Sequence, residues 1–431
     1  MRASLTAARL VVVLAVLALL AGCGSQLKAG ASARASTPGA DPGGPPAGPA
    51  AAGSCPATVM STLRTVLQRI YDEGAHSEKT GAAASTIRHS ATLRSALEAG
   101  DQAAVQSAVK DLLASGRMTA LLVRDAAGRQ LAVGGVPSLT PVRGTIKGAG
   151  GRTIGSYLIS VWSYEGFVAE GDGVAQGLLA IRRGEQTLAG PAELPAGPLP
   201  AQGSVTSGGG SYRFTTLQAS EFPSGAPLTI YVLRASASIE HLCGARAEDT
   251  VVNTLSGVAN LIYKAEAGAR THVQVRRVQH DATLLHAVAA GDAPATRRAI
   301  ERLLNQHIVR MRVSNRGGLL ADVGGPYVLA PVVAPLRLGG RQIGRVVLSI
   351  QDDEGYLRLA RRLAGLSVLM YMRGNTLVKN SLGPGVGGLA SVPASGRYVY
   401  RGRTFRVVTI NARAFPSGPL TIRVLIPIPY R

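Results

Sequence analysis

Cysteine, aromatic residues and long apolar runs are scarce in this chain of 431 residues. Three cysteines exclude a disulfide-dense small protein and a cysteine-rich zinc array. Phe, Trp and Tyr together make up 4% of the residues, so few side chains are available to stack on nucleic-acid bases. No apolar run reaches the roughly 18 residues that a membrane-spanning helix needs, which excludes a polytopic membrane protein.

Acidic residues are also few. The chain has 46 Lys and Arg against 25 Asp and Glu, which gives a formal net charge of +21. The arginines are scattered along the chain instead of gathered in a tail or in one basic helix, so we expect no nucleic-acid partner. We expect the positive charge to favour an anionic membrane surface or an anionic cell-wall polymer.

The amino terminus carries the strongest local signal. Arg2 and Arg9 precede an apolar stretch, residues 10–20. This stretch suits a secretory signal and is too short to span a bilayer. A Leu-Ala-Gly-Cys sequence at residues 20–23 resembles the lipobox of bacterial lipoproteins. That resemblance implies a signal peptide over residues 1–22 and acylation of Cys23, which would anchor the protein on the extracytoplasmic face of the cell membrane. The alternative is an ordinary secretory signal with a chance cysteine.

A spacer and a disulfide follow from this interpretation. Residues 23–54 are rich in Gly, Ala, Pro and Ser, and we expect them to form a disordered tether between the lipid and the folded part. Once Cys23 is acylated, Cys55 and Cys243 remain in a compartment where disulfides persist. We predict a Cys55–Cys243 bridge, with two free thiols as the alternative.

The folded part contains one unit twice. Five segments of the first half recur in the same order about 190 residues later. The segments are 87–101, 134–135, 151–160, 162–167 and 222–225, and their counterparts are 278–292, 324–325, 340–349, 351–356 and 415–418. Because the offset is nearly constant, few insertions separate the copies, and we predict two domains over residues 55–238 and 239–431.

Each copy opens with helices and continues with short strands. Helical and alternating apolar periodicities distinguish the two kinds of element. The expected helices include 59–70, 103–113, 252–262 and 294–304. The expected strands include 121–125 and 130–133, which form a hairpin, then 154–161, and in the second copy 309–314, 319–323 and 343–350. We therefore predict an α+β fold for each copy, with long N-terminal helices packed on one face of an antiparallel sheet.

The order of these elements resembles the extracytoplasmic Cache sensor domains, which are PAS-like. The most similar stretch is 344–356, which looks like the strand-to-helix segment of such domains from high-GC Gram-positive bacteria. The resemblance covers both copies and implies tandem Cache-like domains that bind a small molecule between the sheet and overlying loops. In that family a transmembrane helix and a signalling module usually follow. Because this sequence stops at Arg431, we expect any signal to pass through a partner such as a membrane receptor or transporter.

Acidic residues at the strand-to-helix junction are the first candidate ligand contacts. Asp352, Asp353 and Glu354 in the second copy have the chemistry to hold an amine or a cation. Capping of the following helix is the alternative, which residue types at these places favour. The remaining candidates are aromatic residues and one carboxylate, for which core packing or a solvated surface is the alternative: Trp162, Tyr164, Glu165, Tyr356 and Tyr371.

No motif for catalysis or for a metal ion is present. The seven histidines contain no HExxH and no HxxxH pair, and the chain has no GxSxG motif and no phosphate-binding loop. We therefore expect no enzyme, no metal site and no cofactor. His89 and His280 occupy equivalent places in the two copies, where we expect a repeated structural hydrogen bond.

These features predict a lipid-anchored, ligand-binding or sensory protein on the extracytoplasmic face of the membrane. It would bind a small molecule and act through a partner protein. The alternative is a cell-envelope scaffold or interaction protein whose basic surface contacts anionic wall polymers.

Overall fold

The computed structural model describes residues 54–191, 193–265, 267–304, 308–373, 376–383 and 392–430. The predicted signal peptide, Cys23 and all of the predicted tether except Ser54 lie outside the described residues. None of the helices in the described part is long and apolar enough to cross a membrane. We call residues 55–238 the first repeat and residues 239–431 the second repeat, as predicted.

The first repeat begins with helices and continues with strands. Its helices are α2 (Cys55–His76), α3 (Glu78–Arg88), α4 (Ala91–Ala99), α5 (Gln102–Ala114) and α6 (Tyr164–Ala175). Its strands are β1 (Ala120–Asp125), β2 (Gln130–Gly135), β3 (Ser138–Leu139), β4 (Val142–Lys147), β5 (Thr153–Ser160), β6 (Trp162–Ser163), β7 (Leu178–Arg183), β8 (Gln186–Ala189), β9 (Gln202–Ser207), β10 (Gly210–Ser220) and β11 (Pro227–Ala235). The short helix α7 (Ser236–Glu240) leads into the second repeat.

The second repeat has the same order of elements. Its helices are α8 (Ala247–Ala265), α9 (Ala269–Gln279), α10 (Ala282–Ala290), α11 (Ala293–Leu304) and α12 (Asp353–Ala364). Its strands are β12 (Arg310–Asn315), β13 (Gly318–Gly324), β14 (Val332–Leu338), β15 (Arg341–Ser349), β16 (Ser367–Met372), β17 (Thr376–Asn380), β18 (Gly396–Tyr400), β19 (Arg403–Ala414) and β20 (Gly418–Ile428).

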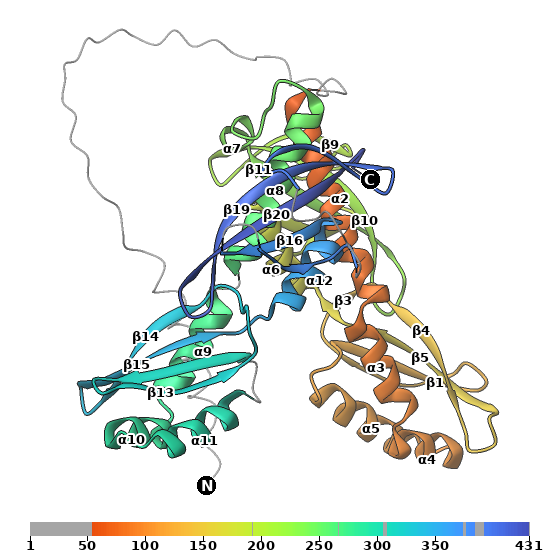
Figure 1. Cartoon of the computed structure of the whole chain (residues 1–431). Coiled ribbons are helices and arrows are strands. Elements are labelled where there is room, and N and C mark those ends of the chain that lie inside the picture. The colour runs from red at the N-terminus through yellow and green to blue at the C-terminus, as the bar shows by residue number, and fades with distance from the viewer. Residues whose placement is uncertain are drawn as a thin grey trace, which may run out of the picture. The chain divides into compact units, whose positions relative to one another are not determined.

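Among the described residues each repeat contains two large antiparallel sheets where the sequence predicts one, and the first repeat also has a two-stranded sheet of β3 and β6. The first repeat has a four-stranded sheet, β2-β1-β5-β4, and a five-stranded sheet, β8-β7-β11-β10-β9. The second repeat reproduces both orders, as β13-β12-β15-β14 and β17-β16-β20-β19-β18 (Figure 1). The α+β class and the duplication are confirmed, and within the described ranges no sheet joins strands of the two repeats. The extra sheet arises because the strands after α6 and after α12 pair mainly with one another, apart from an isolated bridge between Leu329 and Ala414 of β19.

Helices cover one face of each four-stranded sheet. In the second repeat, Met311 and Val346 point into a buried core with Leu284 and Ile300 of the covering helices. Side chains of a strand alternate between its two faces. Residues between the buried ones, such as Arg312, therefore lie on the other face.

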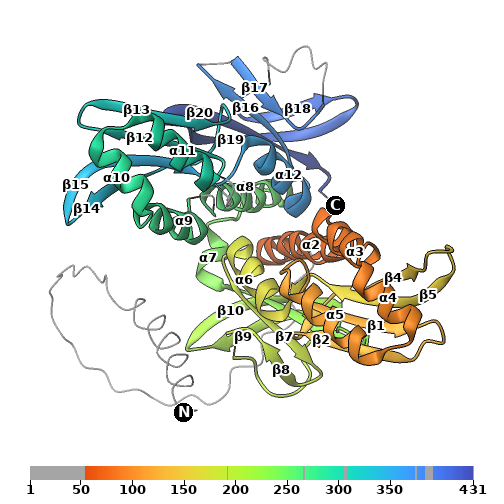
Figure 2. The same cartoon turned by 90° about the horizontal axis from the view of Figure 1, so that it is seen from below.

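The first helices of the two repeats share one hydrophobic core. Leu67 of α2 and Leu255 of α8 belong to the same buried cluster, which also includes side chains of α6 and α12. Figure 2 shows α2 beside α8. An ion pair of 2.6 Å between Arg362 of α12 and Glu73 of α2 adds a polar contact between the repeats. Burial of this apolar surface is the main force that holds α2 and α8 together.

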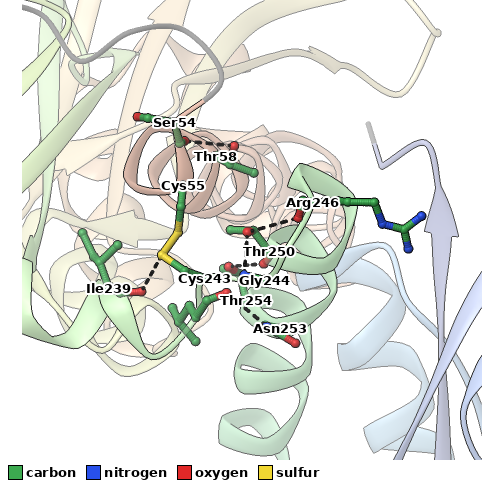
Figure 3. Close-up of a disulfide and its surroundings, with 11 residues drawn as sticks. Ser54, Cys55, Thr58, Ile239, Cys243, Gly244, Arg246, Thr250, Asn253 and Thr254 are labelled. Carbon is green, nitrogen blue, oxygen red and sulfur yellow. Dashed lines mark hydrogen bonds between the residues drawn. A yellow bond between two sulfur atoms is a disulfide. The ribbon is translucent and has the colours of Figure 1, made fainter.

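The predicted Cys55–Cys243 disulfide is confirmed. The two Cα atoms lie 5.5 Å apart, within the usual range for such a bridge. The bond joins the first residue of α2 to the segment just before α8 (Figure 3). In that segment the Gly244 backbone N–H donates to Thr250 Oγ1 at 3.0 Å, which fixes the approach to α8.

The predicted histidine hydrogen bond is also confirmed in both repeats. His89 Nδ1 lies 2.8 Å from the carbonyl oxygen of Ser85, and His280 Nδ1 lies 2.7 Å from that of Arg276. Each histidine follows the last residue of its helix. The side chain therefore contacts a carbonyl that also accepts the histidine's own backbone N–H, at 3.0 Å for Ser85 and 3.2 Å for Arg276.

Candidate functional site

The acidic cluster of the second repeat caps α12. Asp352 Oδ1 accepts a hydrogen bond of 2.5 Å from the Gly355 backbone N–H. Glu354 is exposed and accepts from Lys379 Nζ at 2.8 Å. Asp353 is 3% exposed, its Oδ1 has no hydrogen-bond partner among the described residues, and burial raises its pKa to about 7. The three carboxylates thus point into different surroundings instead of converging on one ligand.

The matching residues of the first repeat have structural contacts. Ser163 caps α6 by accepting from the Gly166 backbone N–H at 3.0 Å. Tyr164 is buried and donates to the Glu221 carboxylate at 3.0 Å, and its pKa is raised to about 12, chiefly by burial. Trp162 is half-buried and packs on Phe167, with ring centroids 6.0 Å apart. Glu165 is exposed.

Both tyrosine candidates of the second repeat lie in the core. Tyr356 is fully buried, and its hydroxyl donates to the Ala259 carbonyl of α8 at 3.3 Å. Tyr371 is fully buried under Arg423, whose guanidinium carbon lies 4.2 Å from the ring centroid.

An arginine–tyrosine pair fills the space above each five-stranded sheet. In the first repeat Arg182 lies over Tyr231, 5.8 Å from the ring centroid, and donates to the Pro195 carbonyl of the overlying loop at 3.2 Å. In the second repeat Arg423 lies over Tyr371 and donates to the Val392 carbonyl. Phenylalanine and leucine side chains pack around each pair: Phe214, Leu233, Leu194 and Leu199 in the first repeat, and Phe405, Leu369, Leu425 and Leu377 in the second. The Cache resemblance places a ligand between sheet and loops, and here protein side chains occupy that space.

A cavity of about 730 Å³ lies instead on the face of the four-stranded sheet of the second repeat that the helices leave open. We call it the arginine cavity. It is lined by Arg312, Ser314, Asn315, Arg316, Gly318, Leu319, Val333, Gln342, Ile343, Gly344, Arg345, Val347, Pro416 and Ser417. The last two come from the turn between β19 and β20, so both sheets of the repeat contribute to the wall.

Cross-strand pairing explains why these side chains converge. Ser314 of β12 pairs with Arg345 of β15, and Arg312 pairs with Val347. Val347 in turn pairs with Val333 of β14. Residues that pair across antiparallel strands point to the same face. The sheet therefore presents two arginines beside an apolar strip.

The arginines of the cavity have no acidic partner. Among the described residues, Arg312, Arg316 and Arg345 form no ion pair. Arg345 Nε donates to Ser314 Oγ at 3.2 Å, which orients its guanidinium. Val333 is 60% exposed beside them, so charged and apolar surface adjoin.

A paired arginine borders the cavity. Arg310 makes two hydrogen bonds to the Asp322 carboxylate, of 2.9 and 3.0 Å, and its guanidinium carbon lies 4.5 Å from the centre of the Phe415 ring. These contacts hold Phe415, and with it the start of the turn that carries Ser417, against the edge of the cavity. Arg310 is therefore a positioning residue for the wall.

The first repeat has different residues on the same face. Leu122, Ser156 and Ala126 stand where the second repeat has Arg312, Arg345 and Arg316, by the register of the strands and the offset of the repeats. Leu122 is buried with Leu158 and Phe222 in a small apolar cluster. The first repeat keeps Arg124 and Arg143 on this face, where the second has Ser314 and Val333. Among the described residues Arg124 and Arg143 form no ion pair either, so the difference between the repeats is Arg312 at the place of the buried Leu122 and Arg345 at the place of Ser156.

None of the sequence-predicted ligand contacts lines the arginine cavity. A signal for the cavity does exist in the sequence, because Arg310, Arg312 and Ser314 alternate with apolar residues in one strand. A residue-by-residue comparison of the copies would also have shown Leu122 replaced by Arg312. Among the described residues, no group of three or more His, Cys, Asp and Glu could hold a metal ion.

No protein-family model and no curated protein matches the chain. Solved structures match parts of it at low identity. The periplasmic domain of Vibrio cholerae LuxQ is 14% identical, with a TM-score of 0.28 over 39% of this chain and 96% of that domain. The ligand-binding domain of the Pseudomonas fluorescens chemoreceptor CtaA, solved with L-isoleucine, is 13% identical, with a TM-score of 0.25 over 42% and 98%. An extracellular ligand binding receptor from Desulfohalobium retbaense is 12% identical, with a TM-score of 0.26 over 52% and 47%.

Proposed function

We propose that this protein is a lipid-anchored, extracytoplasmic binding protein of the Cache type, which takes an anionic small molecule in the arginine cavity. The observation that carries the proposal is the set of three arginines without acidic partners around one cavity. Cys23 would hold the protein on the membrane, and a membrane receptor or transporter would read the bound state. No catalytic group takes part in this function.

The chemistry of the cavity favours a carboxylate or a phosphate that bears an apolar part. A guanidinium offers parallel N–H donors that match two oxygens of such a group. The arginines are partly exposed, so a ligand would not have to displace an existing ion pair before it binds. Val333 and Val347 provide an apolar surface for the rest of the ligand.

The test replaces the arginines of the cavity by the residues of the first repeat. The variant Arg312→Leu with Arg345→Ser is compared with the unchanged chain in a thermal-shift screen against mono- and dicarboxylates, phosphate monoesters, amines and uncharged nucleosides. We expect a selective rise in melting temperature with one anionic class, because a ligand that binds only the folded state stabilises it. We expect at least a tenfold weaker apparent affinity in the double variant.

The matched control is Arg298→Ala, which removes an exposed arginine of α11 on the helix-covered side. It should leave the shift unchanged. A shift with amines instead of anions, or an equal response of the double variant and the unchanged chain, would contradict the proposed site. Anchoring is tested separately, by mass spectrometry of the mature N-terminal peptide for acylated Cys23.

A second candidate function is an interaction scaffold of the cell envelope. It is favoured by the filled space above both five-stranded sheets, where Arg182 and Arg423 occupy the place predicted for a ligand. In that case no small molecule would shift the melting temperature. The protein would instead be retained on an anionic wall polymer, and added salt would weaken that retention.

A further inference from the structure

The hairpin formed by β18 and β19 concentrates exposed arginine and aromatic side chains. Arg397, Arg401 and Arg403 are exposed, Val399 is 58% exposed, and Arg397 Nη2 also lies 3.8 Å from Glu248 Oε2. The rings of Tyr398 and Tyr400 stack with centroids 6.5 Å apart, and Arg401 lies over Tyr400 at 5.2 Å from its centroid. Aromatic side chains that hold arginines beside them are suited to the boundary between water and lipid headgroups.

The base of this hairpin lies where the described chain begins. Arg406 Nη1 contacts Glu248 Oε1 at 2.8 Å and Asp249 Oδ1 at 3.0 Å, both in the first turn of α8. Cys243, just before α8, is bonded to Cys55 at the start of α2. The turn of the hairpin, at residues 401–402, begins five residues before Arg406. Five residues of extended strand span about 16 Å. Figure 2 shows β18 and β19 as neighbouring strands of this sheet.

The tether puts a membrane within reach of the hairpin. Between Cys23 and Ser54 the chain has 30 residues rich in Gly, Ala and Pro. Even fully extended, 30 residues span at most about 100 Å. An acylated Cys23 would therefore keep the start of α2, and the hairpin next to it, within about 100 Å of the bilayer.

The corresponding hairpin of the first repeat carries a single arginine, Arg213, at the place of Arg406. The register places Ser204, Gly208 and Gly210 of the β9–β10 hairpin where the second repeat has Arg397, Arg401 and Arg403. Both hairpins have the same length, so the difference lies in the side chains alone.

One of these arginines has a backbone conformation that favours glycine. Arg401 has φ +49°, in the left-handed region, and Gly208 has φ +53° at the same place in the first repeat. A non-glycine residue there is strained. A strained residue at an exposed tip adds nothing to packing, and such strain is typical of positions that serve a function.

We propose that the β18–β19 hairpin docks on the anionic phospholipid surface of the membrane that holds the lipid anchor. The arginines contact lipid phosphates, and Tyr400 and Val399 enter the headgroup layer. The inference rests on the proposed anchor for its geometry. The inference goes beyond the proposed function because it adds a second contact with the membrane. This contact would orient the arginine cavity relative to the bilayer.

The test uses the full chain with Cys23→Ser, so that acylation contributes nothing. Co-sedimentation with vesicles of phosphatidylcholine alone is compared with vesicles that contain 30% phosphatidylglycerol, a composition chosen as roughly typical of an anionic surface. The hairpin variant carries Arg397→Ser, Arg401→Gly and Arg403→Gly, the residues of the first repeat. We expect binding to the anionic vesicles only, and a loss of about 100-fold in the hairpin variant, from roughly fivefold per arginine.

The matched control removes three exposed arginines elsewhere, through Arg276→Ser, Arg298→Ser and Arg358→Ser. It lowers the net charge equally and should keep most of the binding. Arg401→Gly alone should bind vesicles more weakly and yet melt at the same or a higher temperature, a combination that damage to the fold would not give.

Three results would overturn the inference: equal binding to uncharged vesicles, an equal loss in the control variant, or equal retention by soluble polyphosphate at the same phosphate concentration. Other measurements test the proposed function. Finding Cys23 without acyl chains would contradict the lipid anchor, and the absence of any thermal shift would contradict ligand binding in the arginine cavity. Neither result changes the vesicle comparison, which uses the unacylated chain.

Discussion

The two repeats use the same two side chains to close their five-stranded sheets but exchange the strands that carry them. Arg182 on β7 and Tyr231 on β11 form the pair of the first repeat. In the second repeat Tyr371 occupies the place of Arg182, and Arg423 occupies the place of Tyr231. Each arginine still lies over its tyrosine and still donates to a carbonyl above the sheet. The contact was therefore maintained while its residues changed places, which indicates that closing this space matters to both repeats.

The open faces of the four-stranded sheets, in contrast, carry different side chains at equivalent positions. Leu122 is buried in an apolar cluster of the first repeat, whereas Arg312 lines a cavity in the second. The backbone is common to both, with the same strand order. The same backbone thus carries a leucine in an apolar cluster in one repeat and an arginine that lines a cavity in the other.

The largest effect is expected from cutting the covalent link between the repeats. Replacing Cys55 and Cys243 by alanine opens a loop of 188 residues. The loop-entropy model assigns about 5 kcal/mol of unfolding free energy to such a bridge. Chemical denaturation followed by circular dichroism measures the change. A loss below about 1 kcal/mol would mean that the shared core of α2 and α8 holds the helices in place by itself.

A smaller loss is expected when the arginine of a closing pair is removed. Arg423→Met should cost about 2 to 3 kcal/mol, because the carbonyl of Val392 loses its donor in a buried place and Tyr371 loses its cover. Arg182→Met should cost at least as much, since Arg182 is 3% exposed and donates to the carbonyls of both Glu185 and Pro195. Urea denaturation of each variant checks both values.

The exchange of positions itself is open to test. The double variant Arg182→Tyr with Tyr231→Arg gives the first repeat the arrangement of the second. We expect it to be at least about 1 kcal/mol more stable than the sum of its single substitutions predicts, because the pair re-forms across the same strands. If the two single substitutions add strictly, the exchanged arginine and tyrosine do not form a stabilising contact.

The sequence predicts what repetition and periodicity control. The constant offset between the copies, the repeated hydrogen bond of His89 and His280 and the bridge of Cys55 with Cys243 all depend on residues near in sequence or on counting. The division into two sheets does not, because strand pairing after α6 and α12 is decided by long-range contacts. Tyr356 and Tyr371 illustrate the same limit: an aromatic residue next to a predicted junction has one sequence signature whether it faces a cavity or the core.

The smallest effect concerns one further position where the repeats differ. Asp353 occupies the place of Tyr164, and burial raises its pKa from 3.8 to about 7. Between these values the unfolded chain releases the proton and the folded chain keeps it, so the stabilising contribution, complete below pH 3.8, is lost as the pH rises through about 7. Asp353→Asn should therefore match the unchanged chain in acid and exceed its unfolding free energy above neutrality.

The comparison residue supplies the control for this pH dependence. Tyr164 has a pKa of about 12, so Tyr164→Phe should shift stability by the same amount at every pH from acid to neutral. Asp172 of the first repeat, whose pKa burial raises to about 6, adds a similar slope that neither substitution removes. The informative quantity is thus the difference between Asp353→Asn and the unchanged chain, measured by urea denaturation at several pH values. A constant difference would mean that Asp353 is ionised throughout, with Lys379, whose charge opposes the rise in pKa, as the dominant neighbour.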